Sequence, residues 1–264
     1  MAVKTKITLH EVNKLFVSFN FIKLVPTTSG IVDTTYIAIT KNREYILKKY
    51  ERDIEDRIKK DTKLLKKLKN AGLNVPTLLE SKNKWFLYEK LRGNEPKVVK
   101  IYHIQALARF LAKLHSITYD KTNTKGYSQK DEISKALKFT KDNFFLYYKK
   151  LEFLKSYKPK NDGFIHGDIF KDNTVFDTHK LGIFDFIDGD NGSFYFDIAV
   201  ALVSFDAKKH NFYFINLFLN TYNQHSPKKL NKEELLKHLH IASSFYALKR
   251  ILSYKNTKKA KELL

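Results

Sequence analysis

Residues 164–176 place a short block of polar side chains between two apolar stretches. The centre of this segment reads His166-Gly167-Asp168, and Asn173 follows the aspartate five residues later. The pattern predicts two short strands joined by a polar turn, and each of these residues taken singly is most often a turn former. Their order and spacing together go beyond what a turn requires, and they indicate a reactive loop held between strands.

A later aspartate in a second apolar segment extends the pattern. Asp185 lies within residues 183–186, where it is followed by phenylalanine. Phosphoryl transfer requires a carboxylate that accepts the proton of an attacking hydroxyl, and hard oxygen ligands for the magnesium that bridges the phosphates of ATP. Kinase catalytic loops supply the base and an Asn ligand at the same spacing, and a later Asp-Phe supplies the second ligand. The sequence therefore predicts an ATP- and magnesium-dependent small-molecule kinase, with Asp168 as catalytic base and Asn173 and Asp185 as metal ligands.

Several neighbouring residues have structural alternatives. His166 is more typical of a residue that orients the loop through hydrogen bonds than of one that transfers a proton. Asp185 could instead cap a turn at the end of a strand. Asp188 and Asp190 follow it in a glycine-containing loop, where they are either solvated turn formers or further acidic groups of the site. We retain Asp188 as a candidate substrate-binding residue.

Composition bounds the class of protein. The chain has 264 residues, of which 43% are hydrophobic, so it can bury a substantial core. It contains no cysteine, which excludes a disulfide framework and a thiolate metal site. The N-terminal residues lack the apolar segment of a signal peptide, and no apolar run is long enough to span a bilayer. We therefore expect a soluble cytoplasmic protein without a membrane partner.

The formal net charge of +21 is the main competing signal, because strongly basic proteins often bind nucleic acid or anionic membranes. Nearly all of the excess is lysine, scattered along the chain, whereas base-reading surfaces favour arginine. No aromatic or glycine-rich RNA-binding signature accompanies the lysines. We interpret the charge as a lysine-rich solvated surface and expect no specific nucleic-acid partner.

The order of predicted elements indicates two lobes. Apolar residues at helical spacing predict helices over residues 7–20, 53–70, 101–117 and 131–156, near 195–221, and over 232–255. Residues 21–50 read as short strands, and Trp85–Glu89 reads as another. We therefore predict an α+β, bilobal protein-kinase-like fold, with a small mixed N-lobe containing an antiparallel sheet (residues 1–91) and a larger, mainly helical C-lobe (residues 92–264).

The His-Gly-Asp-(x4)-Asn motif, followed by an apolar strand and Asp-Phe, resembles the aminoglycoside phosphotransferase and choline kinase superfamily. Segments Gly30–Tyr36, Tyr45–Glu51 and Gly163–Phe176 resemble its homoserine kinase branch, and together they extend the likeness over most of the chain. The first segment departs from that branch at Val32, Asp33 and Thr35. The resemblance implies transfer of the γ-phosphoryl group of ATP to a small-molecule hydroxyl, with L-homoserine, a threonine-biosynthesis metabolite, as the first-choice acceptor.

The resemblance also implies nucleotide-binding residues in the N-lobe. Lys48 and Lys49 compete as the phosphate-binding lysine, because alternation along a strand lets only one face the cleft. The family's Val-Leu-Lys pattern aligns with residues 46–48 and favours Lys48. Asp61 fits the position of its acidic partner better than Glu55, although surface pairing along the helix would explain either acid.

Further candidate residues follow from the same resemblance. Ser29 and Gly30 lie where a nucleotide-covering loop would contact phosphates through backbone amides and hydroxyls. Glu89 lies where backbone atoms would hold adenine. Asp197 either caps a helix N-terminus or, by family analogy, braces the backbone of the catalytic loop. Arg250 resembles a helical arginine of the homoserine kinase branch and could clamp an acceptor carboxylate, or it could lie at a solvated helix edge.

Alternative acceptors and one different class of function remain open. Choline or ethanolamine would require an aromatic cage, and an aminoglycoside would require an acidic surface, which the net charge of +21 disfavours. A sugar is a further candidate. A non-catalytic basic protein that binds nucleotide or nucleic acid on a kinase-like fold is the rival class. Protein kinase activity is not expected, since no activation segment ending in Ala-Pro-Glu follows Asp185.

Overall fold

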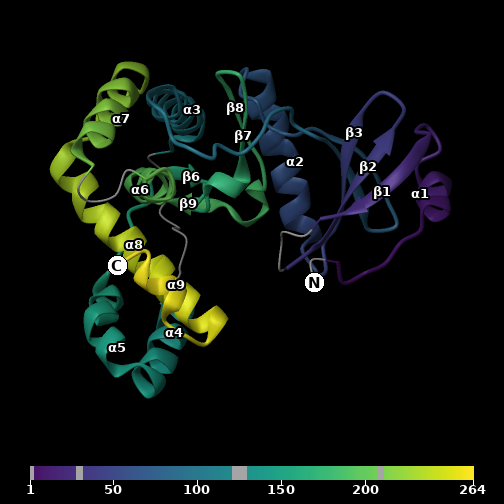
Figure 1. Ribbon diagram of the computed structural model, residues 1–264. Helices are drawn as coiled ribbons and strands as arrows, with labels where there is room; N and C mark the ends of the chain where they lie inside the picture. Colours follow the sequence, from purple (N-terminus) through teal and green to yellow (C-terminus); the bar gives the residue numbers. More distant parts are fainter. Residues whose placement is uncertain (1–2, 28–31, 121–129, 207–210) are drawn as a thin grey trace. The chain divides into compact units, whose positions relative to one another are not determined.

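The computed structural model describes four stretches of the chain, residues 3–27, 32–120, 130–206 and 211–264. The chain divides into two compact units. The first comprises Met1–Gly93 and Gly182–Ile187, and the second comprises Asn94–Leu181 and Asp188–Leu264. An antiparallel sheet dominates the first unit and helices dominate the second (Figure 1), which confirms the predicted α+β class.

The first unit is built on a five-stranded antiparallel sheet with strand order β1-β2-β3-β5-β4. The strands are β1 (Phe21–Pro26), β2 (Thr34–Thr40), β3 (Glu44–Lys49), β4 (Leu78–Lys82) and β5 (Trp85–Glu89). The strands predicted within residues 21–50 and at Trp85–Glu89 are confirmed. Successive side chains of a strand point to opposite faces of the sheet, so neighbouring residues of β3 lie in different surroundings.

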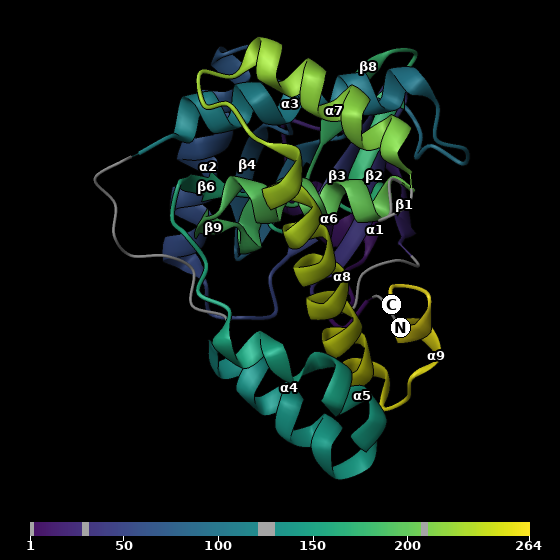
Figure 2. The same cartoon turned by 90° about the vertical axis from the view of Figure 1, so that its left-hand side faces the viewer.

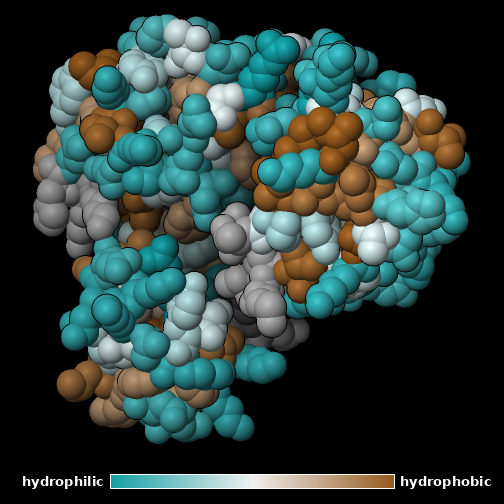
Figure 3. All heavy atoms as spheres, turned by 45° about the vertical axis from the view of Figure 1, so that its right-hand side comes forward, coloured by the Kyte–Doolittle hydropathy of each residue, from teal (hydrophilic) through white to brown (hydrophobic). Residues whose placement is uncertain are grey.

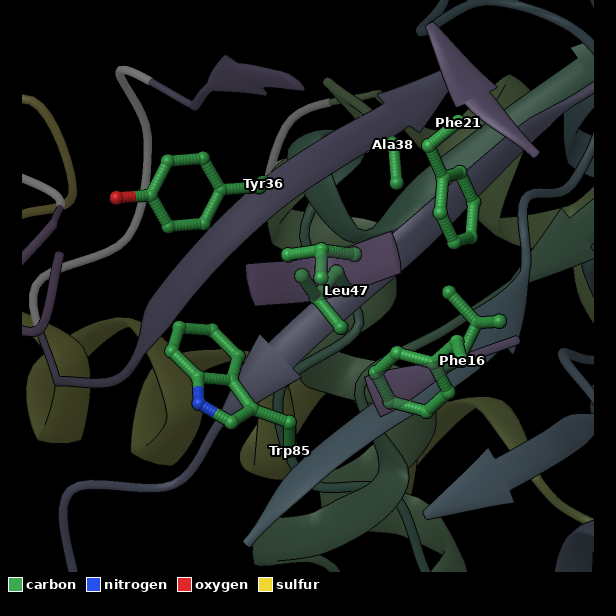
Figure 4. Close-up of a cluster of buried hydrophobic side chains, with 8 residues drawn as sticks. Phe16, Phe21, Tyr36, Ala38, Leu47 and Trp85 are labelled. Atoms are coloured by element: carbon green, nitrogen blue, oxygen red, sulfur yellow. The ribbon is translucent and has the colours of Figure 1, made fainter. Parts of the chain in front are cut away.

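One face of this sheet packs on helix α1 (Leu9–Leu15) through a largely aromatic cluster (Figure 4). Thr8 and Glu11 form a capping box that starts the helix. The helix is shorter than the predicted 7–20, because the chain leaves helical geometry at Phe16, whose side chain is buried in the cluster. The fully or nearly buried members of the cluster are Val12, Phe16, Phe21, Tyr36, Ala38, Leu47, Trp85 and Leu87.

The segment Gly182–Ile187 joins the first unit although it comes much later in the sequence. Ile187 is buried with Tyr50, which follows β3, and with Ile58 of helix α2 (Glu55–Asn70). The Ile183 amide also donates a hydrogen bond to the Asn74 carbonyl (3.1 Å). These contacts fix the backbone on both sides of Asp185.

The second unit is mainly helical. In the two views of Figures 1 and 2, α3 lies beside α7 and α6 lies beside α8, while α4 and α5 pack against α8. The helices are α3 (Ile101–Thr118), α4 (Lys130–Asn143), α5 (Phe145–Leu151), α6 (Phe194–Ser204), α7 (Phe212–His225), α8 (Lys232–Tyr254) and α9 (Lys258–Lys261).

The single helix predicted over residues 131–156 is wrong, because the chain breaks it at Phe144. This residue has φ −144° and ψ 60°, outside the helical region. The Asn143 side chain donates to the Phe139 carbonyl (2.8 Å), which satisfies an acceptor at the end of α4. The chain then continues as α5 and a 3₁₀ helix, Glu152–Ser156.

Two short strand pairs hold the polar segment found in the sequence. β6 (Gly163–Ile165) pairs with β9 (Asp190–Gly192), and β7 (Thr174–Asp177) pairs with β8 (Lys180–Ile183). Gly163 has φ +151°, and a Cβ there would lie 2.3 Å from the Thr118 carbonyl oxygen. Only glycine therefore allows β6 to pass this close to the end of α3.

The surface is polar over most of the face shown in Figure 3, with small hydrophobic patches between hydrophilic residues. Within the described stretches, none of the helices combines the length and the apolar character that crossing a membrane requires.

Candidate active site

The polar segment forms a loop between β6 and the 3₁₀ turn Lys171–Asn173. Gly167 adopts φ +73°, a left-handed conformation that turns the chain sharply before Asp168. The Asp168 amide donates to Nδ1 of the buried His166 (3.3 Å). Nδ1 accepts this hydrogen bond, so the imidazole orients the backbone that carries Asp168, and the part of His166 in catalysis stays a prediction.

Asp197 of α6 binds the backbone of this loop. Its buried carboxylate accepts hydrogen bonds from the Gly167 amide (2.7 Å) and the His166 amide (3.2 Å). The N-cap of α6 is Ser193, so the alternative of Asp197 as an N-cap is wrong. Asp197 therefore braces the backbone of the loop at His166 and Gly167, as the family resemblance implied.

A histidine from α3 completes the brace. His115 Nε2 lies 3.1 Å from Asp197 Oδ2, and His115 Nδ1 lies 2.9 Å from the Tyr222 hydroxyl. Its ring also stacks on Phe194, with centroids 3.9 Å apart. Sequence reasoning missed His115 and Tyr222, because within the apolar stripe of residues 101–117 a histidine has no motif around it.

Asn173 is hydrogen-bonded to Asp168, five residues before it in the loop. Its Nδ2 donates to the Asp168 carbonyl (2.8 Å) and lies 3.3 Å from Asp168 Oδ2. Because the amide nitrogen is used inside the loop, the amide oxygen is the end of the side chain that remains suited to a hard cation. The role of Asn173 as a magnesium ligand stays a prediction.

Tyr246 of α8 touches the carboxylate of Asp168, and sequence reasoning missed it. The Tyr246 hydroxyl lies 2.9 Å from Asp168 Oδ1 and also contacts the Gly167 carbonyl oxygen. Desolvation raises the pKa of Asp168, whereas His166, the Tyr246 hydrogen bond and the charge of Lys249 act in the opposite direction. A raised pKa makes a carboxylate more basic, which is compatible with the predicted role of Asp168 as the base.

We expect Tyr246→Phe to move the acid limb of the pH–rate profile to higher pH. The hydrogen bond favours ionised Asp168, so its loss raises the pKa further, and the ionised base then disappears at a higher pH as the solution is acidified. The loss of kcat on the high-pH plateau should be about tenfold or less. The measurement is kcat/KM against pH, with Tyr254→Phe on the exposed end of α8 as the matched control. An unchanged acid limb would contradict the role of Tyr246.

In the first unit, Lys48 and Asp185 form a close ion pair, with Nζ 2.6 Å from Oδ1. The Lys48 side chain is 14% exposed and its ammonium lies over the Tyr50 ring. Lys49 lies over the Trp85 ring instead, as alternation along β3 requires. Asp185 has φ +68°, which aspartate tolerates better than most residues, and its side chain is 41% exposed.

Asp61 is buried on α2. Desolvation raises the pKa values of Tyr50 and Tyr88, whose hydroxyls lie 3.1 Å apart, and the charges of Asp61 and Asp185 raise them further. Burial and these charges therefore favour the neutral form of both hydroxyls. The pairing of Asp61 with Lys48 stays a prediction, and the ion pair defined for Lys48 is the one with Asp185.

The remaining predicted residues lie in varied surroundings. The Glu89 amide donates to the Thr77 carbonyl (2.9 Å), and its carboxylate pairs with Lys69 (2.8 Å). Asp188 is exposed at the end of a 3₁₀ turn. Ser29 and Gly30 lie outside the described residues. Adenine and substrate contacts at Glu89 and Asp188 stay predictions.

Arg250 is occupied within its own unit. Its Nη1 donates to the Lys259 carbonyl (3.1 Å) and lies 3.5 Å from Glu262 Oε2, so the guanidinium holds α9 against α8. An acceptor carboxylate would have to compete with these two partners. Its role as a carboxylate clamp stays a prediction.

This combination of fold and loop defines a phosphotransferase of the kinase-like class. Residues 23–218 match the model of the phosphotransferase enzyme family, and the chain belongs to this family. The predicted superfamily is thereby confirmed.

Individual relatives agree with this assignment. A homoserine kinase from Methylobacillus flagellatus is 24% identical over 227 residues, which is 76% of this chain and 70% of that protein. Among solved structures, the macrolide 2'-phosphotransferase MphH from Brachybacterium faecium has a TM-score of 0.70 at 15% identity, covering 97% of both chains. The amicoumacin kinase hAmiN, in complex with AMP-PNP and Ca²⁺, has a TM-score of 0.69 at 18% identity, covering 97% of this chain and 91% of its own. These structural similarities confirm the predicted kinase-like fold.

Proposed function

We propose that this protein transfers the γ-phosphoryl group of ATP to the hydroxyl of a small molecule, and that L-homoserine is the acceptor. The observation that carries the proposal is Asp168, a carboxylate of raised pKa fixed by Tyr246 and by a braced loop. A relative named homoserine kinase supports the acceptor, and the complex of hAmiN with AMP-PNP supports ATP as the donor.

Asp168 acts as the base in this proposal. The acceptor hydroxyl donates its proton to the Asp168 carboxylate as its oxygen bonds to the γ-phosphorus, and the bond from that phosphorus to the β,γ-bridging oxygen breaks, so that ADP leaves. His166 and Tyr246 hold that carboxylate in place, one through the backbone and the other through Oδ1. Fixed placement of the base is important, because phosphoryl transfer depends mainly on positioning and on charge stabilisation.

Asn173 and Asp185 are the proposed magnesium ligands. Magnesium takes few protein ligands and completes its shell with phosphate oxygens and water, and it neutralises charge on the transferred group. No cluster of three or more His, Asp or Glu side chains suited to a metal occurs in the described residues. An amide oxygen and a carboxylate oxygen are ligands that suit a magnesium ion arriving with ATP.

Lys48→Met should raise the KM for ATP about 10- to 100-fold, because a charge-assisted contact to phosphate is lost. Lys49→Met is the matched control, since Lys49 lies on the other face of β3 over Trp85. Steady-state kinetics with varied ATP measures both variants. If the control raised KM equally, the assignment of Lys48 would be wrong.

A coupled ADP-release assay tests the proposed function. Purified protein is given ATP and magnesium with L-homoserine, L-serine, choline, ethanolamine or kanamycin. We expect magnesium-dependent turnover that is highest with L-homoserine. Selective turnover of another acceptor would overturn homoserine and keep the phosphotransferase. No turnover with any acceptor, together with salt-sensitive binding of nucleic acid, would favour the basic binding protein instead.

A further inference from the structure

Next to Tyr246 on α8 stands a lysine that sequence reasoning did not single out. Residues three positions apart on a helix are surface neighbours, so Lys249 lies on the same face as Tyr246. Its Nζ lies 5.5 Å from the centroid of the Tyr246 ring and 5.5 Å from that of Phe245. The Tyr246 hydroxyl in turn lies 2.9 Å from Asp168 Oδ1. One aromatic ring thus links the ammonium to the candidate base.

Phe170 closes another side of the same ring. Its ring meets that of Tyr246 edge to face, with centroids 4.7 Å apart. In this unit the exposed Asp168 carboxylate is contacted by the Tyr246 hydroxyl and by Asn173 Nδ2, and the Lys249 ammonium lies near the Tyr246 ring. Lys249 is also among the groups whose charge stabilises ionised Asp168. A small acceptor whose hydroxyl reaches Asp168 comes within the electrostatic range of that ammonium.

The next residue along the helix, Arg250, has different contacts. Successive residues of a helix are about 100° apart around the axis. Arg250 contacts the Lys259 carbonyl and Glu262, so its guanidinium stabilises the chain end. Of these two adjacent cations, Lys249 is the one that contacts Tyr246, whose hydroxyl is hydrogen-bonded to Asp168.

We propose that Lys249 is a specificity residue that pairs with an anionic group of the acceptor, so that the site takes hydroxy acids carrying a carboxylate rather than cationic alcohols. This inference rests on the proposed function and assigns the acceptor class by charge. The ammonium attracts a carboxylate brought in beside the reacting hydroxyl, and it repels choline, ethanolamine or a polycationic aminoglycoside.

A matched pair of acceptors isolates this effect. L-Homoserine and 3-aminopropan-1-ol share the hydroxyl, the amine and the carbon spacing between them, and they differ by the carboxylate. The ratio of kcat/KM for the two cancels any change that affects both, including a change in the basicity of Asp168. We expect Lys249→Gln to lower this ratio about 10- to 100-fold, as for loss of a charge-assisted hydrogen bond.

Two further variants sharpen the experiment. Lys249→Arg keeps the positive charge and should retain most of the preference for L-homoserine. Lys237→Gln removes the same charge from the same helix, where Lys237 pairs with Glu233 at the surface about 18 Å along the axis. This control should leave the ratio unchanged. A thermal melt of each variant shows that the fold is retained.

The outcomes separate the two proposals. The inference is supported if the ratio is lower than wild type in Lys249→Gln but stays close to the wild-type value in Lys249→Arg and in Lys237→Gln. Turnover of L-homoserine with an unchanged ratio in Lys249→Gln overturns the inference alone and keeps the phosphotransferase. Absence of ADP formation with every acceptor overturns the proposed function and this inference with it. A fall in the ratio for Arg250→Gln, without one for Lys249→Gln, would return the role to Arg250.

Discussion

Replacing Asp168 by asparagine should lower kcat for phosphoryl transfer about 10²- to 10⁴-fold, the range that a positioned general base contributes. Asparagine keeps the size of the side chain and an oxygen for the Tyr246 hydroxyl, but it cannot accept the acceptor's proton. The KM for ATP should change little, because the proton transfer concerns the hydroxyl and not the nucleotide. Single-turnover formation of ADP with excess enzyme measures the chemical step.

Asp177→Asn provides the control for this prediction. Asp177 is an exposed aspartate at the end of β7. Its replacement by asparagine changes the net charge by the same amount as Asp168→Asn. We expect wild-type kcat in this variant and an unchanged melting temperature in both. If Asp168→Asn retained kcat within a factor of about three, far less than a general base contributes, Asp168 would not be the base.

Replacing Asp197 by alanine should destabilise the protein by about 3–5 kcal/mol, because two loop amides and a histidine ring lose the buried carboxylate to which they are hydrogen-bonded. The buried carboxylate accepts hydrogen bonds from two loop amides and lies 3.1 Å from His115 Nε2. Alanine leaves these donors buried without an acceptor, which adds a desolvation cost to the lost bonds. The loop that carries Asp168 would also lose its anchor, so kcat should fall even at temperatures where the variant is folded.

Urea denaturation measures the free energy of unfolding for this variant. Ser193→Ala, at the N-cap of the same helix, is the control. The buried Ser193 hydroxyl has no hydrogen-bond partner in the described part of the chain, so its removal should be neutral or slightly stabilising. A loss of less than about 1 kcal/mol in Asp197→Ala would show that the brace contributes little, because an ordinary hydrogen bond alone contributes that much.

The local pattern of the sequence was sufficient for the catalytic loop. His166, Asp168 and Asn173 lie within eight consecutive residues, and the hydrogen bonds that join them run between residues two and five positions apart. Such contacts depend on the backbone of one turn, so their spacing in the sequence carries the geometry. The bounds of β5 followed equally directly from one short apolar run.

Residues distant in the sequence were not predictable in this way. Tyr246 reaches Asp168 across 78 residues, and His115 meets Tyr222 across 107. No local periodicity relates such pairs, because they meet only after α3, α6, α7 and α8 have packed. The break at Phe144 was missed for a related reason: apolar spacing continued through it, while the backbone did not.

The sequence by itself determined the local geometry of the loop at residues 166–173, the α+β class and the phosphotransferase family, since these depend on short motifs and on the order of elements. Only the tertiary structure decided which side chains from distant parts of the sequence contact the Asp168 carboxylate. Lys249 and Arg250 are adjacent cations on one helix, and a resemblance in sequence favoured the second. Packing associates Lys249 with Tyr246 and directs Arg250 to Glu262, because a turn of about 100° between neighbours exposes them to different surroundings.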